Sequence, residues 1–189
     1  KIEKLITSKT KIIIVVHYAG VSCDMDKIMK IAKNYNLKVI EDAAQAICSK
    51  YKGRPCGSIG EIGCLSFHQT KNINCGKGGA ILINKENLIE RSEVITSKGT
   101  NRSAFLSGKV DKYTWTDLGS SYRATEILCA ILNSQLKNSK RIIQERLDLW
   151  NYYYYQFSKI NEEKFFNMPH IPSYSEHNAQ IFYIILDKS

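Results

Sequence analysis

The run Ile12–Val16 most constrains the fold of this chain, because it contains five consecutive β-branched residues and no polar side chain. Such a run is typical of a strand in a parallel sheet that is covered on both faces. Asp24 is placed to cap a helix that ends near Asn36, and a second short strand follows at Lys38–Glu41. The apolar residues of this helix recur at helical spacing: Met25, Ile28, Met29 and Ala32. The order strand, helix, strand predicts a βαβ unit with a right-handed crossover, and hence an α/β fold.

The rest of the sequence extends this α/β pattern and contains no internal repeat. We expect a short helix at 43–46, a loop at 53–63, strands at 64–67 and 80–83, a helix at 84–97, helices at 124–134 and 140–160, and a strand at 179–186. The stretch 99–121 has neither a helical nor a strand period and is rich in Gly, Ser, Thr and aromatic residues. Irregular segments of this length inside a compact domain are usually functional.

Two polar residues follow apolar strands at places where a parallel sheet holds its ligands. Lys71 lies between the strand at 64–67 and the glycine run Gly76–Gly79, and Asp42 directly follows the strand that ends at Glu41. A lysine amine can form a Schiff base with an aldehyde, and a carboxylate can keep a pyridine nitrogen protonated. The pair therefore indicates pyridoxal phosphate. The alternatives are a solvated surface lysine at Lys71 and a helix N-cap at Asp42.

Several short strings carry a resemblance to a known family. The segments around Asp42 and Lys71 read Ile40-Glu41-Asp42-Ala43-Ala44-Gln45 and Ser66-Phe67-His68-Gln69-Thr70-Lys71-Asn72. Further matching strings are Val16-His17-Tyr18-Ala19-Gly20, Lys98-Gly99-Thr100-Asn101-Arg102-Ser103, Asp111-Lys112-Tyr113-Thr114-Trp115 and Gly119-Ser120-Ser121-Tyr122-Arg123. In this combination and order they resemble the DegT/DnrJ/EryC1/StrS sugar aminotransferases, from about Ile14 to Leu186.

The resemblance implies a role for each of five residues. Lys71 would hold pyridoxal phosphate covalently and, as the free amine, move a proton between the substrate carbon and the cofactor. Asp42 would keep the pyridine nitrogen protonated, and Gln45 would contact the phenolic oxygen of the ring. Ser66 would donate to the cofactor phosphate, and Ser121 would reach the phosphate bound by the neighbouring subunit. The plain alternatives are a surface glutamine at Gln45 and a half-buried strand serine at Ser66.

The resemblance also implies the architecture. It predicts a large domain of fold type I, similar to aspartate aminotransferase, with a mostly parallel sheet flanked by helices. Residues 1–168 would form part of this cofactor-binding domain, and residues 169–189 a linker and the first strand of a small C-terminal domain. Members of the family are considerably longer than 189 residues, so we expect this chain to be a central part that lacks an N-terminal segment and most of the small domain.

The function implied by the resemblance is transfer of an amino group from an amino acid, L-glutamate, to a nucleotide-linked sugar in a homodimeric enzyme. The strings are most similar in members that convert dTDP-4-dehydro-6-deoxy-D-glucose to dTDP-4-amino-4,6-dideoxy-D-galactose for enterobacterial common antigen, a cell-surface polysaccharide. The alternatives are a related aminotransferase with another nucleotide sugar and a catalytically inactive remnant. Lys77 and Gln180 bear on the last alternative, because relatives carry a glutamate and a histidine at these places.

Charge and cysteine usage exclude other classes of function. The chain has 27 Lys and Arg against 18 Asp and Glu, a net charge of +9. The lysines are scattered rather than gathered in a stripe, so we expect no nucleic-acid partner. The six cysteines form no CxxC pair and no metal-type spacing with histidine, which predicts free thiols and no metal. No apolar run approaches the ~20 residues of a membrane span, so we expect a cytoplasmic protein without a membrane partner.

Overall fold

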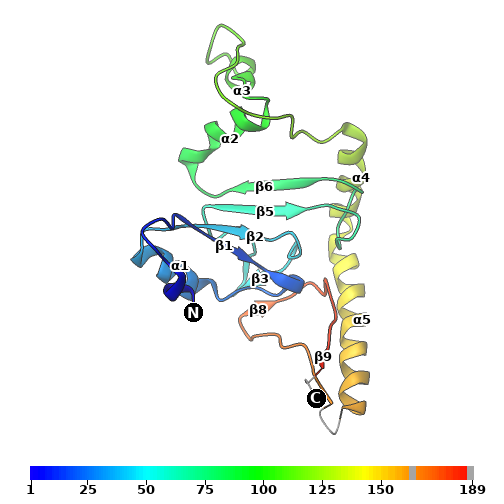
Figure 1. The fold of residues 1–189 in the computed structure, drawn as a ribbon. Coiled ribbons are helices and arrows are strands. Elements are labelled where there is room, and N and C mark those ends of the chain that lie inside the picture. Colours follow the sequence, from blue (N-terminus) through cyan, green and yellow to red (C-terminus); the bar gives the residue numbers. More distant parts are fainter. Residues whose placement is uncertain (162–164, 187–189) are drawn as a thin grey trace.

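Four strands form the central sheet of this computed structural model, which describes residues 1–161 and 165–186 (Figure 1). Their order is β1-β2-β5-β6, and their bounds are β1 (Ile12–Val16), β2 (Lys38–Asp42), β5 (Ile62–Ser66) and β6 (Gly79–Ile83). β1, β2 and β5 are parallel, whereas β6 forms an antiparallel hairpin with β5. The predicted α/β fold with a mostly parallel sheet is confirmed.

One face of this sheet is covered by α1 (Met25–Asn34). The helix begins at Asp24, whose side chain accepts a hydrogen bond from the Lys27 backbone N–H, as expected for an N-cap. Val15 and Val39 point from the sheet into a core with Met25 and the other apolar residues of the helix. The predicted βαβ unit is therefore built by the burial of one helix stripe against alternate strand residues.

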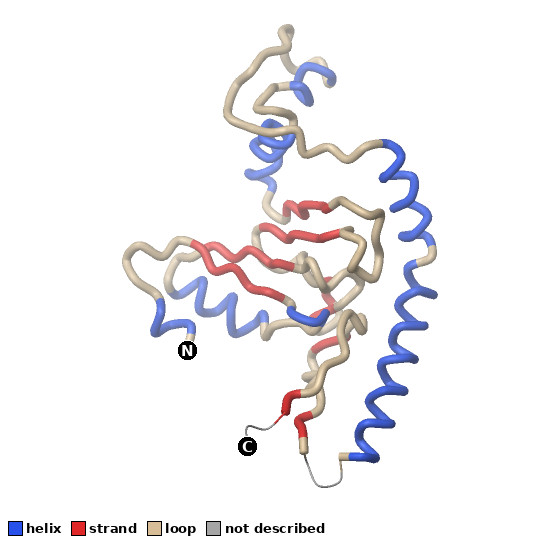
Figure 2. The backbone as a smooth tube through the Cα atoms, turned by 45° about the vertical axis from the view of Figure 1, so that its right-hand side comes forward, coloured by secondary structure: helices blue, strands red, loops and turns tan. Residues whose placement is uncertain are grey.

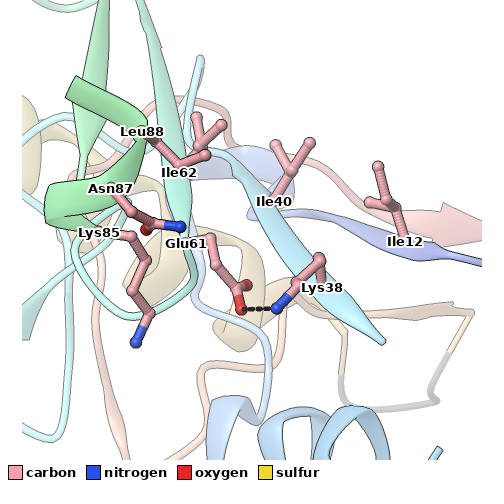
Figure 3. Close-up of a pocket in the computed structure, with 8 residues that line it drawn as sticks. All are labelled: Ile12, Lys38, Ile40, Glu61, Ile62, Lys85, Asn87 and Leu88. Atoms are coloured by element: carbon pink, nitrogen blue, oxygen red, sulfur yellow. Dashed lines mark ion pairs between the residues drawn. The ribbon is translucent and has the colours of Figure 1, made fainter. Parts of the chain in front are cut away.

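The opposite sheet face is largely uncovered. In register across the four strands lies a row of isoleucines, Ile14, Ile40, Ile62 and Ile83, and Ile14 is 65% exposed. A cavity of about 270 Å³ lies on this face. Figure 3 shows that Ile12, Ile40 and Ile62, which line it, point the same way. Lys38 and Glu61 form an ion pair of 3.9 Å at its edge. This cavity lies near the amino ends of the parallel strands, away from Asp42 and Ser66.

The other elements surround this sheet. They are η1 (Ile2–Leu5), η2 (Tyr18–Gly20), η3 (Glu86–Leu88), α2 (Ile89–Thr96), α3 (Arg102–Leu106), α4 (Glu126–Lys137) and α5 (Ser139–Ile160). A small sheet joins β3 (Lys50–Tyr51), β4 (Arg54–Pro55) and β8 (Ser175–Glu176), and β7 (Phe166–Asn167) pairs with β9 (Ile185–Leu186). Figure 2 shows α4 and α5 running along the side of the sheet toward which the carboxyl ends of the parallel strands point. No helix in the described ranges is long and apolar enough to cross a membrane.

Three predicted elements differ in the structure. Residues 43–46 form a turn rather than a short helix, because the Asp42 carboxylate and the Ala43 carbonyl each accept a single local hydrogen bond. The irregular stretch 99–121 contains the short helix α3. The strand predicted at 179–186 is present only at 185–186, because Ala179 has a left-handed φ of 53° and the Ile181 carbonyl accepts from the Trp150 indole N–H instead of from a neighbouring strand; residues 187–189 lie outside the described part.

Candidate functional site

Asp42 and Ser66 lie at the carboxyl ends of neighbouring parallel strands. Asp42 ends β2 opposite Cys64 of β5, and Ser66 follows two residues later on the same sheet face. Both side chains are half-buried, and the Ser66 hydroxyl oxygen accepts a hydrogen bond from the His68 backbone N–H over 3.3 Å. The burial of Cys64 and the negative charge of Asp42 both raise the pKa of the Cys64 thiol. This edge is therefore a place where an anionic side chain and a hydroxyl face outward together.

The Asp42 carboxylate is anchored through one oxygen only. Its Oδ1 accepts from the Ala44 backbone N–H over 3.0 Å, which closes a tight turn rather than capping a helix. Its Oδ2 has no hydrogen-bond partner among the residues that the structure describes. The Asp42 carbonyl accepts from the His17 N–H over 3.0 Å, which also holds the backbone. One carboxylate oxygen is thus positioned yet available to a ligand.

Lys71 lies in the hairpin loop between β5 and β6. Its backbone N–H donates to the His68 carbonyl over 2.8 Å, and the next residues, Asn72 and Ile73, are buried. The Lys71 side chain is half-buried, and its Nζ forms no ion pair or hydrogen bond within the described ranges. A lysine that is sheltered but unpaired is placed to react with a carbonyl group. Lys77, further along the loop, is exposed, so its charge remains in solvent.

Gln45 contacts the chain rather than bulk solvent. Its Oε1 accepts a hydrogen bond of 2.7 Å from the backbone N–H of Ala19, a residue with a left-handed φ of 57°. Non-glycine residues in this region are uncommon and need support from their surroundings. The Gln45 side chain is half-buried, and its predicted contact with the cofactor ring remains a prediction. Gln45 therefore ties the turn after β2 to the turn after β1.

Asn178 joins these turns to the lysine loop, a role that no local sequence pattern indicated. Its fully buried side chain donates from Nδ2 to the carbonyl oxygens of Gln45 and Ile47, over 2.9 and 2.8 Å. Its own carbonyl accepts from Asn72 Nδ2 over 2.7 Å. Gly20, at φ 79°, must be glycine, because a Cβ there would collide with the Asn178 side chain. Asn178 thereby ties the Gln45 turn to the lysine loop, next to the paired strand ends that carry Asp42 and Ser66.

A buried hydrogen-bonded pair of His17 and Glu41 lies behind this region and was also not anticipated. His17 Nε2 and Glu41 Oε2 are 2.9 Å apart, and both side chains are fully buried. The Cys23 N–H donates to His17 Nδ1 over 3.1 Å, so the imidazole is neutral and its Nε2–H donates a hydrogen bond to the Glu41 carboxylate. The carboxylate also accepts from the backbone N–H groups of Gly57, Ile59 and Gly60 over 2.8, 2.6 and 2.6 Å. The sequence offers one signal for Glu41, because a charged residue inside a buried strand requires hydrogen-bonding partners.

Glu41→Ala is expected to lower the free energy of unfolding by about 3–5 kcal/mol, because it leaves a buried imidazole and buried N–H groups without an acceptor. Burial raises the pKa of Glu41, but the hydrogen bonds from His17, Gly60, Gly57 and Ile59 outweigh it and lower the pKa. The stabilisation is therefore present above the ordinary glutamate pKa and is lost as pH falls through the folded one. Urea titration measures it. Glu176→Ala, which removes an exposed ion pair with Lys50, is the control at about 1 kcal/mol or less; equal losses would contradict this role.

Ser121 lies apart from the other candidate residues. It forms a bridge with Ser97 in the arm, which we define as residues 97–123, and is exposed. With Lys98, Arg102 and Arg123 it lines a separate pocket of about 60 Å³. Figure 1 shows α3 and the following chain standing beyond β6, on the side away from β1. The predicted contact of Ser121 with a phosphate of another subunit remains a prediction.

Comparison with known proteins gives one family. The profile of the DegT/DnrJ/EryC1/StrS aminotransferase family matches residues 1–189. The chain is 38% identical over 153 residues to GDP-perosamine synthase of Escherichia coli O157:H7, which covers 80% of this chain and 40% of that protein. It is 31% identical to UDP-4-amino-4,6-dideoxy-N-acetyl-beta-L-altrosamine transaminase of Campylobacter jejuni, covering 97% of this chain and 47% of that protein.

A solved structure shows the same fold. The aminotransferase from Psychrobacter cryohalolentis superposes with a TM-score of 0.89 at 32% identity, over 97% of this chain and 49% of that chain. The chain thus spans about half the length or less of these relatives.

Proposed function

Because the chain belongs to the DegT/DnrJ/EryC1/StrS aminotransferase family, whose enzymes use pyridoxal 5′-phosphate, we propose that it carries the amino-transfer site of a nucleotide-sugar aminotransferase. The observation that supports this most is the unpaired Nζ of the half-buried Lys71, which lies in the loop after β5, the strand that pairs with the Asp42 end of β2. The two residues that follow Lys71, Asn72 and Ile73, are buried, and the Asn72 side chain bonds to the Asn178 carbonyl. The lysine loop is therefore packed against the protein, which a solvated surface lysine would not need.

The polar groups of the site fit this cofactor. Lys71 would bind it covalently through Nζ and afterwards move a proton at the substrate carbon. The available Oδ2 of Asp42 would hold the proton of the pyridine nitrogen, a charge-assisted hydrogen bond. Ser66 would donate its hydroxyl proton to the phosphate, because its Oγ lies at the same edge and already accepts from His68 N–H. When bound, the cofactor supplies an electron sink for the transferred amino group.

Gln45 and Ser121 have different roles in this proposal. Gln45 shapes the ring side of the site, because its carboxamide holds Ala19 in its left-handed conformation. Ser121 would serve a second copy of the chain in a homodimer. The apolar surface of the arm supports this assembly, since Trp115, Leu118 and Tyr122 are all largely exposed. A cytoplasmic location, and a boundary at 168/169 between the large domain and the start of a small one, complete the proposal.

We propose a nucleotide-linked 4-keto-6-deoxy sugar as the amino acceptor and L-glutamate as the donor. The specific acceptor expected from the sequence is dTDP-4-dehydro-6-deoxy-D-glucose, with a product used for enterobacterial common antigen. The names of the relatives contain GDP-linked and UDP-linked amino sugars, so they define the competing substrates. All three acceptors share a nucleoside diphosphate and a keto group.

A substrate panel tests this function. The protein is loaded with pyridoxal phosphate and given L-glutamate with the dTDP-, GDP- or UDP-linked keto sugar, and the amino sugar is detected by mass spectrometry. We expect amination of the dTDP sugar in preference to the others, and none with Lys71→Ala. Preference for another nucleotide would correct the substrate and keep the reaction. No product from any acceptor, together with no cofactor adduct, would favour the inactive remnant.

A further inference from the structure

We propose that Gln180 is a positioning residue for Lys71. Its carboxamide bridges the two peptide groups that flank the lysine. Oε1 accepts from the Asn72 backbone N–H over 3.3 Å, and Nε2 donates to the Thr70 carbonyl over 3.0 Å. This inference rests on the proposed role of Lys71 as the cofactor-binding lysine.

The orientation of the carboxamide follows from its partners. An N–H group can only donate and a carbonyl can only accept, so the oxygen of Gln180 must face Asn72 and the nitrogen must face Thr70. The remaining backbone donor, the Lys71 N–H, is satisfied by His68 within the loop. The backbone on both sides of the lysine is therefore held from outside the loop by one side chain.

Gln180 is itself held firmly. Its backbone N–H donates to Asn178 Oδ1 over 3.1 Å, and Asn178 is bonded to the carbonyls of Gln45 and Ile47. Between them lies Ala179, which is buried and has a left-handed φ of 53°. A non-glycine residue keeps such a conformation only when its surroundings impose it. The segment 178–180 thus couples the position of the Lys71 loop to that of the Gln45 turn.

This coupling matters for chemistry because reactive groups must be placed to within a fraction of an ångström. The Lys71 Nζ has no hydrogen-bond or ion-pair partner in the described part of the chain, so the position of the loop backbone sets where the lysine side chain starts. Gln180 is half-buried and lines a cavity of about 200 Å³ with Arg146, Trp150 and Phe182. A shorter side chain at position 180 would enlarge this cavity and would not open a new hole in a packed core.

The test compares Gln180→Leu, which removes both hydrogen bonds at similar volume, with Gln144→Leu. Gln144 is an exposed glutamine of α5 whose side chain bonds, among the described residues, only to Asp148, so it is the matched control. In the cofactor-free protein, hydrogen exchange of the Asn72 amide should speed up about tenfold in Gln180→Leu and remain unchanged in Gln144→Leu. The borohydride-reducible yield of pyridoxal phosphate on Lys71 should fall several-fold in Gln180→Leu only.

Gln180→Glu adds a readout that a merely structural role would not move. The ionised carboxylate can still accept from Asn72 but repels the Thr70 carbonyl, whereas the protonated acid can donate to it. The adduct yield, relative to wild type, should therefore recover as pH is lowered from about 8 to about 5, toward the ordinary range of a carboxyl pKa. Arg146, which lines the same cavity, and the neighbouring His177 are the charged or titratable groups to replace as controls.

Each outcome decides the inference. Faster exchange at Asn72 with a pH-dependent recovery in Gln180→Glu supports it. Unchanged exchange in Gln180→Leu, or the same adduct yield as wild type, overturns it. If the wild-type protein forms no adduct on Lys71, the proposed function fails, while the exchange experiment still decides whether Gln180 holds the loop.

Discussion

Lys71→Ala is expected to abolish the borohydride-reducible adduct with pyridoxal phosphate and all amino transfer. The reason is structural, because Lys71 is the loop lysine that is half-buried and carries an Nζ without a partner in the described ranges. Alanine removes both the covalent attachment and the amine that would move the proton. The adduct is measured by the visible absorbance of the loaded protein and by mass spectrometry after reduction.

Lys77→Ala is the matched control for this experiment. Lys77 belongs to the same loop but is exposed, and a lysine in solvent does not compete for a sheltered aldehyde. We expect its adduct to remain on Lys71 with unchanged yield. A reduced adduct that persists in Lys71→Ala on another lysine would show that the cofactor site lies elsewhere.

Asp42→Asn is expected to slow amino transfer by at least about a hundredfold while part of the cofactor remains bound. The amide oxygen can still accept from the Ala44 N–H, so the turn after β2 is kept. The negative charge that would hold the pyridine proton is lost, and each factor of ten corresponds to ~1.4 kcal/mol of transition-state stabilisation. Single-turnover kinetics with L-glutamate measures this step without the sugar substrate.

Asp26→Asn provides the comparison at the other side of the sheet. Asp26 lies on α1, which covers the sheet face opposite the Asp42 side chain, and forms an exposed ion pair with Lys52. The same change of charge there should leave the transfer rate within about twofold, since exposed ion pairs contribute little. Near-normal turnover in Asp42→Asn would rule out the proposed role of this carboxylate.

Local sequence patterns were sufficient for the elements that place the site. The β-branched run at Ile12–Val16 became β1, and Asp24 capped α1 as predicted, because strand burial and capping depend on neighbouring residues. The sequence also indicated that Asp42 and Lys71 lie near strand ends: Asp42 is the last residue of β2, and Lys71 lies in the loop after β5. Capping and strand burial patterns involve residues within one turn or one strand, so they can be recognised directly in the sequence.

Contacts between distant segments were not predictable in this way. The turn at 43–46 was expected to be helical, because its alanines favour a helix, but the bond from Ala44 to the Asp42 carboxylate prevails. Glu41 could be recognised as a buried charge, yet its partners Gly57, Ile59 and Gly60 lie in a loop without a regular pattern. Gln180 was noted only as a departure from relatives, and its contacts with Thr70 and Asn72 emerged from the fold.

The hydrogen bonds between residues 178–180 and the lysine loop also bear on the order in which the protein folds. The hydrogen bonds from Asn72 and Gln180 that close the site join residues 106 to 110 positions apart, and those of Asn178 to Gln45 and Ile47 span 133 and 131 positions. Contacts of such high sequence separation form late, whereas β1 and β2 can pair as soon as α1 is made. A nascent chain would therefore hold a finished sheet before it holds a lysine in working position. Partial release of the last segment would likewise switch off cofactor capture while the sheet stays folded.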